Sequence, residues 1–262
     1  NKDGALSFEN PRIFENGKGV TSWEELIKSV RADVKGTKTK LRLGAASGQW
    51  KAMVADEAAR VAFAKNIKKI LEKNKLDGID LDFEWAETEK EYEDYSLAIL
   101  KMREVLGDKY VFSVSLHPVC YKISKEAIAA VDFISYQCYG PSPVRFPMEK
   151  YCSDIQMALA YGIPKEKLVA GVPFYGVTKD GSKKTEAYFS FVQDGLITGS
   201  AQNEVTYKGD VYVFDGQNNI RAKTRYAMDQ QLKGMMSWDL ATDMPLNDSR
   251  SLFKTMVEEL GR

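Results

Sequence analysis

Three carboxylates stand at every second position of one short segment, KLDGIDLDFEW (75–85). Successive side chains of an extended strand point to opposite faces, so Asp80, Asp82 and Glu84 would share one face. The other face would carry large apolar side chains, those of Ile79, Leu81, Phe83 and Trp85. A row of carboxylates is costly to bury unless it meets water or a ligand, so the segment indicates a site with chemistry.

The crowding of this row indicates acid catalysis. Same-face neighbours on a strand have Cα atoms about 6.6 Å apart, and like charges at short range raise the pKa of at least one carboxyl group. Glu84 is the last and longest of the three, so we predict that it is the acid and that Asp82 tunes it. Glycoside hydrolysis needs such a protonated carboxyl group to donate to the leaving oxygen.

Three other interpretations of the row stay open at this point. A calcium loop would repeat Asp-x-Asp, but the EF-hand order places its glycine after the first acids, whereas Gly78 precedes Asp80 and Asp82. A structural network would pair the buried acids with an arginine such as Arg42 or Arg145. A magnesium-carboxylate site of a barrel enzyme is the third alternative.

The composition excludes several classes of function. The 37 basic residues balance the 37 acidic ones, which gives no electrostatic support for a nucleic-acid or anionic-membrane partner. No apolar run approaches the roughly 20 residues that span a bilayer. With one histidine and three cysteines at no metal-ligand spacing, we predict no metal and no cofactor. A Cys120–Cys152 disulfide and three free thiols remain alternatives.

The chain alternates between strand-like and helix-like segments. We predict strands at 40–46, 75–85, 110–118, 132–140, 167–176 and 234–242. Amphipathic or capped segments predict helices at 22–34, 56–76, 88–107, 124–131, 148–162, 220–232 and 249–260. This alternation, with apolar strands, is typical of a parallel sheet covered by helices.

The strands end in residues that can bind or react. These residues are Trp50, Glu84, His117, Tyr139, Tyr175 and Trp238. Active sites of (β/α) barrels lie at the carboxyl ends of the strands, so we favour an α/β fold of the barrel type over an open doubly wound sheet.

The segment DGIDLDFE resembles the DGxDxDxE signature of glycoside hydrolase family 18, which includes chitinases and endo-β-N-acetylglucosaminidases. Downstream, KLVAGVPFYG (167–176) is similar to the family's GxPFYG strand. The closing segment 220–243 resembles a helix followed by a strand that ends in tryptophan. The resemblance covers most of residues 40–262 and implies a (β/α)8 TIM-type barrel.

The resemblance also implies roles for single residues. Glu84 would be the general acid/base, Asp82 would orient the substrate's N-acetyl group, and Asp80 would be its partner deeper in the barrel. Tyr139 would hydrogen-bond the N-acetyl oxygen, and Trp238 would form the floor under the sugar. In this family the substrate's own acetamido oxygen is the nucleophile, so no second catalytic carboxylate is required.

Further substrate contacts are expected from strand ends. Gln137 shares the barrel-facing side with Tyr139 by the period of two, which favours a ligand contact. Tyr175 is predicted either to wall a subsite or to pack in the core. Trp50 is predicted either to stack on a sugar ring or to pack against a loop.

Two features depart from the family pattern. Many members carry Met-x-Tyr-Asp where this chain has Gln137, Cys138, Tyr139 and Gly140, so the hydrogen bonding around the acetamido group changes. In addition, NKDGALSF (1–8) resembles the segment that follows the family's second strand. We therefore expect a barrel that lacks its first two strands in this chain, either trimmed or incomplete.

These features predict one catalytic barrel domain over residues 1–262, with a small insert at about 177–215. The predicted function is retaining, substrate-assisted hydrolysis of β-1,4 linkages of N-acetylglucosamine in chitin or its oligosaccharides, by a monomer. An endo-β-N-acetylglucosaminidase and a catalytically weak glycan-binding protein are the alternatives. The family implies an extracytoplasmic location, and a chain that opens at Asn1 is expected to be processed or trimmed.

Overall fold

The computed structural model describes residues 1–7, 22–46 and 48–261. The chain divides into two compact units, which are described separately. The first unit comprises Asn1–Ser115 and Lys122–Asp132, and the second comprises Leu116–Tyr121 and Phe133–Arg262. The expectation for the opening segment 1–8 concerns residues that are only partly described. That residues 1–262 form one catalytic barrel domain stays a prediction.

The first unit is built on three parallel strands, β1 (Arg42–Ala46), β2 (Gly78–Asp82) and β3 (Val111–Leu116), with β2 in the middle. The last residue of β3 belongs to the second unit. In the register of these strands, Gly44 of β1 and Ser113 of β3 lie opposite Asp80 of β2. The carboxylate strand is therefore flanked on both sides inside its own unit.

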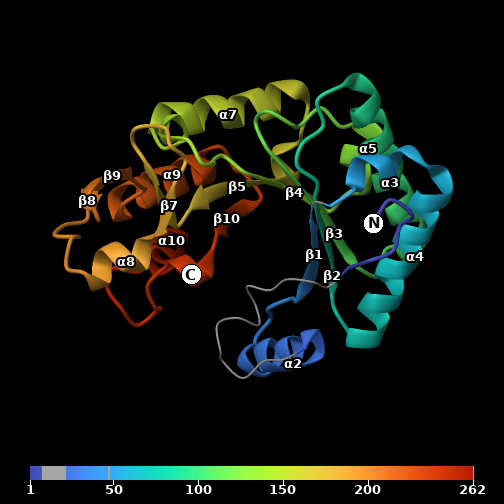
Figure 1. Ribbon diagram of the computed structural model, residues 1–262, viewed down its shortest axis with the longest axis horizontal. Coiled ribbons are helices and arrows are strands. Elements are labelled where there is room, and N and C mark those ends of the chain that lie inside the picture. The colour runs from blue at the N-terminus through green and yellow to red at the C-terminus, as the bar shows by residue number, and fades with distance from the viewer. Residues whose placement is uncertain (8–21, 47, 262) are drawn as a thin grey trace. The chain divides into compact units, whose positions relative to one another are not determined.

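In the described part of the first unit, five helices accompany the strands. They are α2 (Trp23–Asp33), α3 (Trp50–Ala55), α4 (Glu57–Asn74), α5 (Glu89–Leu106) and α6 (Lys125–Ala130). Helices α3, α4 and α5 pack against one another and lie beside the three strands (Figure 1). The helix predicted from residue 22 begins with a cap, because the Ser22 hydroxyl accepts the Glu25 main-chain N–H at 3.2 Å at the start of α2.

The alternation predicted for β2 is confirmed along the strand itself. Ile79 and Leu81 are completely buried, whereas the Asp80 and Asp82 side chains are only partly buried on the opposite face. The strand ends at Asp82, so the prediction that it continues through Glu84 and Trp85 was wrong. Beyond the strand the alternation no longer applies, and Trp85, which the alternation placed on the apolar face, is 37% exposed.

The second unit contains the parallel strands β4 (Phe133–Tyr136), β5 (Leu168–Pro173) and β10 (Gly234–Trp238), with β5 in the middle. Its main helices are α7 (Met148–Tyr161), α9 (Gln217–Asp229) and α10 (Leu252–Glu259). Short 3-10 helices occupy Pro143–Arg145, Lys165–Lys167 and Leu240–Thr242. Every residue of β5 is buried, as expected for a central strand of a covered parallel sheet. Six parallel strands were predicted, and six are found in the described residues.

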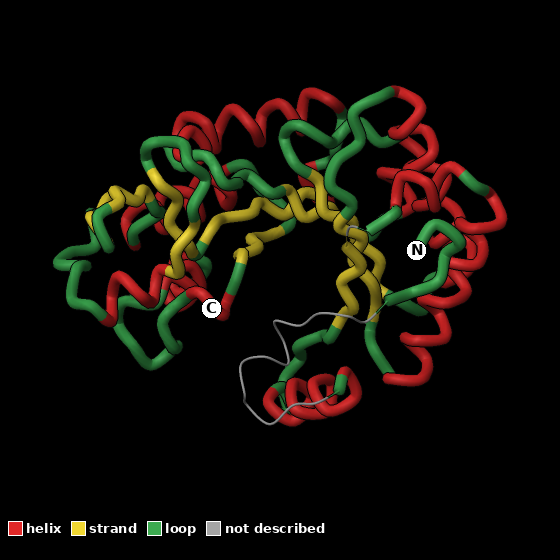
Figure 2. The backbone as a smooth tube through the Cα atoms, viewed as in Figure 1, coloured by secondary structure: helices red, strands yellow, loops and turns green. Residues whose placement is uncertain are grey.

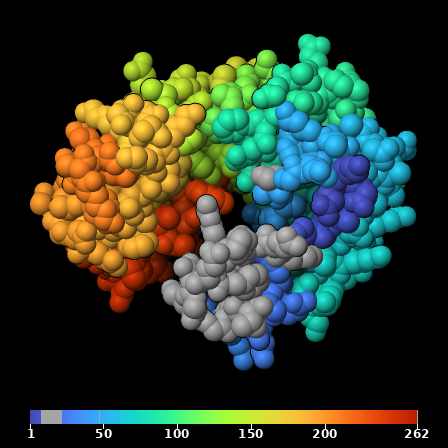
Figure 3. All heavy atoms as spheres, viewed as in Figure 1, coloured from blue at the N-terminus to red at the C-terminus, as the bar shows by residue number. Residues whose placement is uncertain are grey.

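An antiparallel insert follows β5 in the second unit. It consists of β6 (Tyr175–Thr178), β7 (Thr185–Ala187), α8 (Tyr188–Gln193), β8 (Glu204–Tyr207) and β9 (Asp210–Val213), and its sheet has the order β7-β6-β9-β8. Figure 2 shows the short strands and the helix of this segment grouped together, and in the space-filling view of Figure 3 its atoms, coloured yellow-orange to orange, form one continuous body. The ring of Phe191 contacts those of Tyr207, Tyr212 and Phe214 at 5.5–5.6 Å, so the insert has an aromatic core of its own. Its sheet begins at Tyr175, two residues before the predicted start.

A buried ion pair ties the end of the insert to α9. The Lys223 ammonium lies 2.5 Å from the Asp215 carboxylate, and both side chains are fully buried. The same ammonium lies 5.3 Å from the ring centroid of Tyr151 on α7. Removing one partner of such a pair typically destabilises a protein by about 3–5 kcal/mol, because the other charge stays buried without compensation. The pair therefore holds the insert against the helices of its unit.

The alternatives left open for the cysteines are settled by the structure. Cys120, Cys138 and Cys152 are all free thiols, and the first two are buried. Across the described ranges, none of the helices combines the length and apolar character that crossing a bilayer requires.

Gly78 opens β2 where the backbones of β2 and β3 come close together. A Cβ atom at this position would lie 1.9 Å from the carbonyl oxygen of Val111, which is main chain and cannot turn away. We predict that Gly78→Ala lowers the free energy of unfolding by about 1 to 3 kcal/mol, because the two strands must move apart. Urea denaturation measures this change.

Gly44→Ala, in the neighbouring strand β1, is the matched control for stability. A Cβ there meets no atom within 4 Å. Equal losses of stability in the two variants would contradict the steric explanation for Gly78.

Candidate active site

The carboxylate row begins with Asp80, which is enclosed by donors of its own unit. The Ser113 hydroxyl donates to Asp80 Oδ1, and the Ser115 hydroxyl donates to Oδ2 at 2.7 Å. The Arg42 guanidinium lies 3.5 Å from Oδ1 and also donates to the Ser113 hydroxyl. The structural-network interpretation therefore holds for Asp80 and Arg42.

The other arginine proposed for that network has a different partner. Arg145 lies in the second unit and pairs with the buried Asp154 of α7 at 3.0 Å. Lys150 donates to the same carboxylate, so two cations hold Asp154. This cluster belongs to the packing of α7.

Glu84 lies two residues after β2, with an exposed side chain. Its main chain is held, because the Trp50 indole N–H donates to the Glu84 carbonyl oxygen at 3.2 Å. The carboxylate can therefore move on a backbone that is held in place. Such an arrangement suits a group that must deliver a proton to a bound molecule.

Trp50 itself is a packing residue in the structure. Its side chain is 4% exposed and stacks on Phe83 at 5.3 Å, with Tyr95 at 5.5 Å. Of the two roles predicted for Trp50, the structure supports packing rather than stacking on a sugar ring, because Phe83 covers one ring face. The contribution of Trp50 to the site is the hydrogen bond to Glu84.

The loop between Glu84 and α5 is held at its other end as well. The Lys51 ammonium lies 3.1 Å from carboxylate oxygens of both Glu87 and Glu91. Glu91 also accepts the Glu87 amide at 2.7 Å and forms a capping box with Thr88. Trp50 and Lys51 of α3 thus hold the segment that carries Glu84 from two sides.

Tyr139 contacts one other predicted site residue within the second unit. The Tyr139 hydroxyl lies 3.6 Å from the Met236 sulfur of β10, and its ring meets that of Tyr175 edge to face at 6.4 Å. Gln137 is buried, and its main-chain N–H donates to the Leu116 carbonyl at 2.8 Å. The structure therefore brings Tyr139 and Tyr175 together.

Gly171 of β5 leaves the space that the Tyr139 ring occupies. A Cβ atom at Gly171 would lie 2.8 Å from Tyr139 Cε1 and 3.0 Å from Met236 Cε. Sequence reasoning used this glycine only as part of a resemblance. The signal for its role is its place in β5, next to the strand that precedes Tyr139.

His117 holds the main chain at Tyr139. Its Nδ1 accepts the Val119 amide at 3.2 Å, which leaves the proton on Nε2, and Nε2 donates to the Tyr139 carbonyl at 2.9 Å. Burial disfavours the imidazolium form and lowers the pKa of His117 to about 4. His117 is thus satisfied within the fold, and its link to Tyr139 was not predicted from the sequence.

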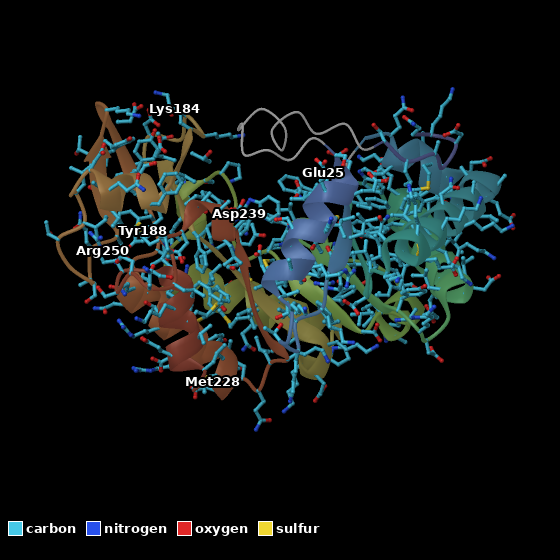
Figure 4. The ribbon with its side chains drawn as sticks, turned by 90° about the horizontal axis from the view of Figure 1, so that it is seen from below. Glu25, Lys184, Tyr188, Met228, Asp239 and Arg250 are labelled. Atoms are coloured by element: carbon cyan, nitrogen blue, oxygen red, sulfur yellow. The ribbon has the colours of Figure 1, made fainter. Side chains whose placement is uncertain are left out.

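Trp238 ends β10 with a side chain that is 51% exposed. Its carbonyl accepts the Phe174 amide at 2.8 Å, which fixes the end of the strand. The next residue, Asp239, is labelled in Figure 4 and uses its carboxylate to cap a 3-10 helix by accepting the Thr242 amide at 3.1 Å. The carboxylate of Asp239 is therefore committed to local structure.

The calcium and magnesium alternatives find no support in the part of the chain that the structure describes. It contains no group of three or more His, Cys, Asp or Glu side chains suited to hold a metal ion. Asp80, which would have to be a ligand, accepts two hydroxyls and lies beside Arg42. The close approach of Val111 accounts for Gly78 without a calcium loop.

The family model of glycosyl hydrolases family 18 matches residues 3–243. The chain belongs to this family. "Probable chitinase 2" of Drosophila melanogaster is 24% identical over 259 residues, which cover 75% of this chain and 54% of that protein. The chain thus spans about half the length of the curated relatives it matches.

Solved structures of family members share the fold. A chitinase from Bacteroides thetaiotaomicron has a TM-score of 0.82 and 18% identity, over 98% of this chain and 84% of that one. A mutant class V chitinase from Nicotiana tobaccum, solved in complex with NAG4, has a TM-score of 0.78 and 16% identity, over 100% of this chain and 90% of that one. These likenesses confirm the predicted α/β class and the barrel type of fold.

We predict that His117 makes the stability of the protein depend on pH below neutrality. The unfolded chain binds a proton at His117 near its ordinary pKa of 6.5, whereas the folded chain binds it near 4. Stability contributed by the neutral imidazole is therefore complete above pH 6.5 and is lost as the pH falls towards 4. His117→Gln should reduce this loss by about 1 to 3 kcal/mol, after discounting for solvent screening.

Urea denaturation at several pH values between 4 and 7 measures the effect. Because His117 is the single histidine of the sequence, a difference between the two pH curves is assigned to it. Parallel curves for the two proteins would contradict the prediction.

Proposed function

We propose that this chain hydrolyses β-1,4 linkages next to N-acetylglucosamine in chitin or chito-oligosaccharides, with retention of configuration. The observation that carries the proposal is the end of β2 in a member of glycosyl hydrolase family 18. There Asp80 and Asp82 share one strand face, and the exposed Glu84 follows on a main chain that Trp50 holds.

In this proposal Glu84 is the general acid and later the general base. Protonated Glu84 donates to the glycosidic oxygen as the leaving group departs, and the resulting carboxylate then takes a proton from the attacking water. The exposure of the Glu84 side chain supports the role, because both proton transfers need access to a bound molecule and to water.

The nucleophile in this proposal is the acetamido oxygen of the substrate, which attacks the anomeric carbon and forms an oxazolinium intermediate. Asp82 and Tyr139 orient the acetamido group, with Asp80 as the inner partner of Asp82. Hydrogen bonds that are set in advance stabilise the positive charge that develops in the transition state. The capping role of Asp239 supports this mechanism, because that carboxylate is already engaged.

Three further residues complete the proposed site. Trp238 presents a half-exposed indole that can form the floor beneath a pyranose ring, and Gln137 and Tyr175 are proposed as additional substrate contacts. Trp50 is no longer proposed as a sugar contact, because of its burial. The substrate class is supported by the class V chitinase of the same fold that was solved with NAG4.

The same barrel also allows the two alternatives. Turnover of N-glycan cores without turnover of chito-oligosaccharides would identify an endo-β-N-acetylglucosaminidase. Binding of chito-oligosaccharides without any turnover would identify a glycan-binding protein. Because chitin is an insoluble polymer outside the cytoplasm, the proposed function places this protein in an extracytoplasmic compartment, and we propose that it acts there as a monomer.

We predict that Glu84→Gln abolishes hydrolysis of a fluorogenic chitobioside and leaves oligosaccharide binding nearly unchanged. The substitution removes the transferable proton but preserves the size of the side chain. Loss of the acid should lower kcat by at least about 100-fold, and calorimetric titration measures binding separately.

Glu93→Gln is the matched control, since Glu93 is an exposed glutamate on α5 and belongs to none of the proposed site groups. It should retain the activity of the parent protein. If Glu84→Gln kept more than about a tenth of the parent kcat, a barrier change below about 1.4 kcal/mol, Glu84 would lose this role.

We predict that hydrolysis depends on the N-acetyl group at the cleavage site. Because the acetamido oxygen is the proposed nucleophile, deacetylated or glucose-based analogues should lose kcat and not merely bind more weakly. A thiazoline mimic of the intermediate should inhibit competitively. Comparable kcat on cello-oligosaccharides, or indifference to the thiazoline, would show that another carboxylate attacks.

A further inference from the structure

Arg42 is a cation that faces the row of carboxylates from the neighbouring strand β1. It lies 3.5 Å from Asp80, and the Arg42 and Asp80 side chains are 27% and 17% exposed. The contact is more sheltered than a surface ion pair, so solvent screens it less. No step of the mechanism proposed above uses this guanidinium, and the inference that follows rests on that proposed function.

Arg42 and two serines form a directed chain of donors around Asp80. Arg42 donates to the Ser113 hydroxyl, which in turn donates to Asp80 Oδ1, and the Ser115 hydroxyl donates to Oδ2. Both carboxylate oxygens of Asp80 therefore accept a hydrogen bond from a serine of β3.

The two strands that flank β2 determine the charge around Asp80. On β1, Gly44 lies opposite Asp80, and the residues on the same face of the strand as Gly44 are Arg42 and Ala46. On β3, the side chains that face Asp80 are those of Ser113 and Ser115. Along β2 itself the next residue on this face is Asp82. Among these described neighbours, the charged ones are Arg42 and Asp82.

We propose that Arg42 is a positioning residue of the proposed active site, which compensates the charge of the Asp80 carboxylate directly and through Ser113. The outer carboxylates, Asp82 and Glu84, are then left to exchange protons with a bound molecule. Glu84 is the outermost of the three, whereas Asp80 lies deeper along the strand.

The contact between Arg42 and Asp80 also reduces the electrostatic repulsion among the carboxylates of Asp80, Asp82 and Glu84. Three ionised carboxylates in succession would raise one another's affinity for protons. Arg42 and Asp80 together carry no net charge, so Asp82 can ionise next to a compensated pair. An ionised Asp82 suits the positive charge of the proposed oxazolinium intermediate.

The test compares Arg42→Met with Arg42→Lys on a chito-oligosaccharide, through the pH profile of kcat/KM. A nearby cation favours the ionised form of a carboxyl group, so its removal raises the pH at which the carboxylates lose their protons. Both limbs of the profile should therefore move to higher pH by about one unit in Arg42→Met. Arg42→Lys retains the charge, and its limbs should stay close to those of the parent protein.

Lys73→Met is the matched control for loss of one positive charge. Lys73 lies on α4 of the same unit and pairs with Glu24 at the surface, at 2.9 Å. Its profile should coincide with that of the parent protein. If Arg42 only supported the fold, Arg42→Met would lower kcat/KM equally at every pH, and unmoved limbs would overturn the proposal.

Carbon-13 NMR titration of the Asp80 carboxyl group, assigned with Asp80→Asn, gives a second measurement that needs no turnover. The midpoint should rise in Arg42→Met and return towards the parent value in Arg42→Lys. If Arg42→Met does not fold, Arg42→Gln takes its place in both measurements. An inactive parent protein would refute the proposed function alone, whereas an unmoved Asp80 midpoint would refute the role of Arg42 alone.

Discussion

The alternation of β2 is the constraint on which the first unit depends. One face of the strand must be buried, so Ile79 and Leu81 pack under the helices, and the other face must then carry Asp80 and Asp82. A shift of one residue in its pairing would place the carboxylates in the apolar core, at a cost that no neighbour on that side could compensate. Gly78 fixes the start of the strand, because there the Val111 carbonyl leaves no room for a Cβ atom.

The segment after this strand, which carries the proposed acid Glu84, is held in place by residues that have no proposed catalytic role. Trp50 is buried and binds the Glu84 carbonyl, while Lys51 gathers the two glutamates that begin the next helix. The burial of Trp50 and the exposure of Glu84 are complementary. A side chain can transfer a proton to a substrate only when the substrate can reach it. It keeps the position that this transfer requires only when its main chain is held in place.

Much of this arrangement could be predicted from the sequence, because hydrophobic period, caps and turn residues are local signals. The six parallel strands and the Ser22 cap are of this kind. The early end of β2 was not predicted, and the burial of Trp50 and the pairing of Arg42 with an acid of the row stood only among the alternatives that the sequence left open. Each depends on residues far apart in the chain: Trp50 lies 34 positions from Glu84, and Arg42 lies 71 positions from Ser113. No local pattern contains such a contact.

The two units differ in the charge of the candidate residues that they supply. The first contributes carboxylates, whereas the second contributes the neutral Gln137, Tyr139 and Trp238. The burial of His117 lowers its pKa to about 4, so this side chain of the second unit is neutral at neutral pH as well. In the mechanism proposed above, the neutral candidates bind the amide and the sugar ring, and the nucleophilic step is left to the substrate. The carboxylates of the first unit then serve acid catalysis, which is the chemistry that the carboxylate row indicates.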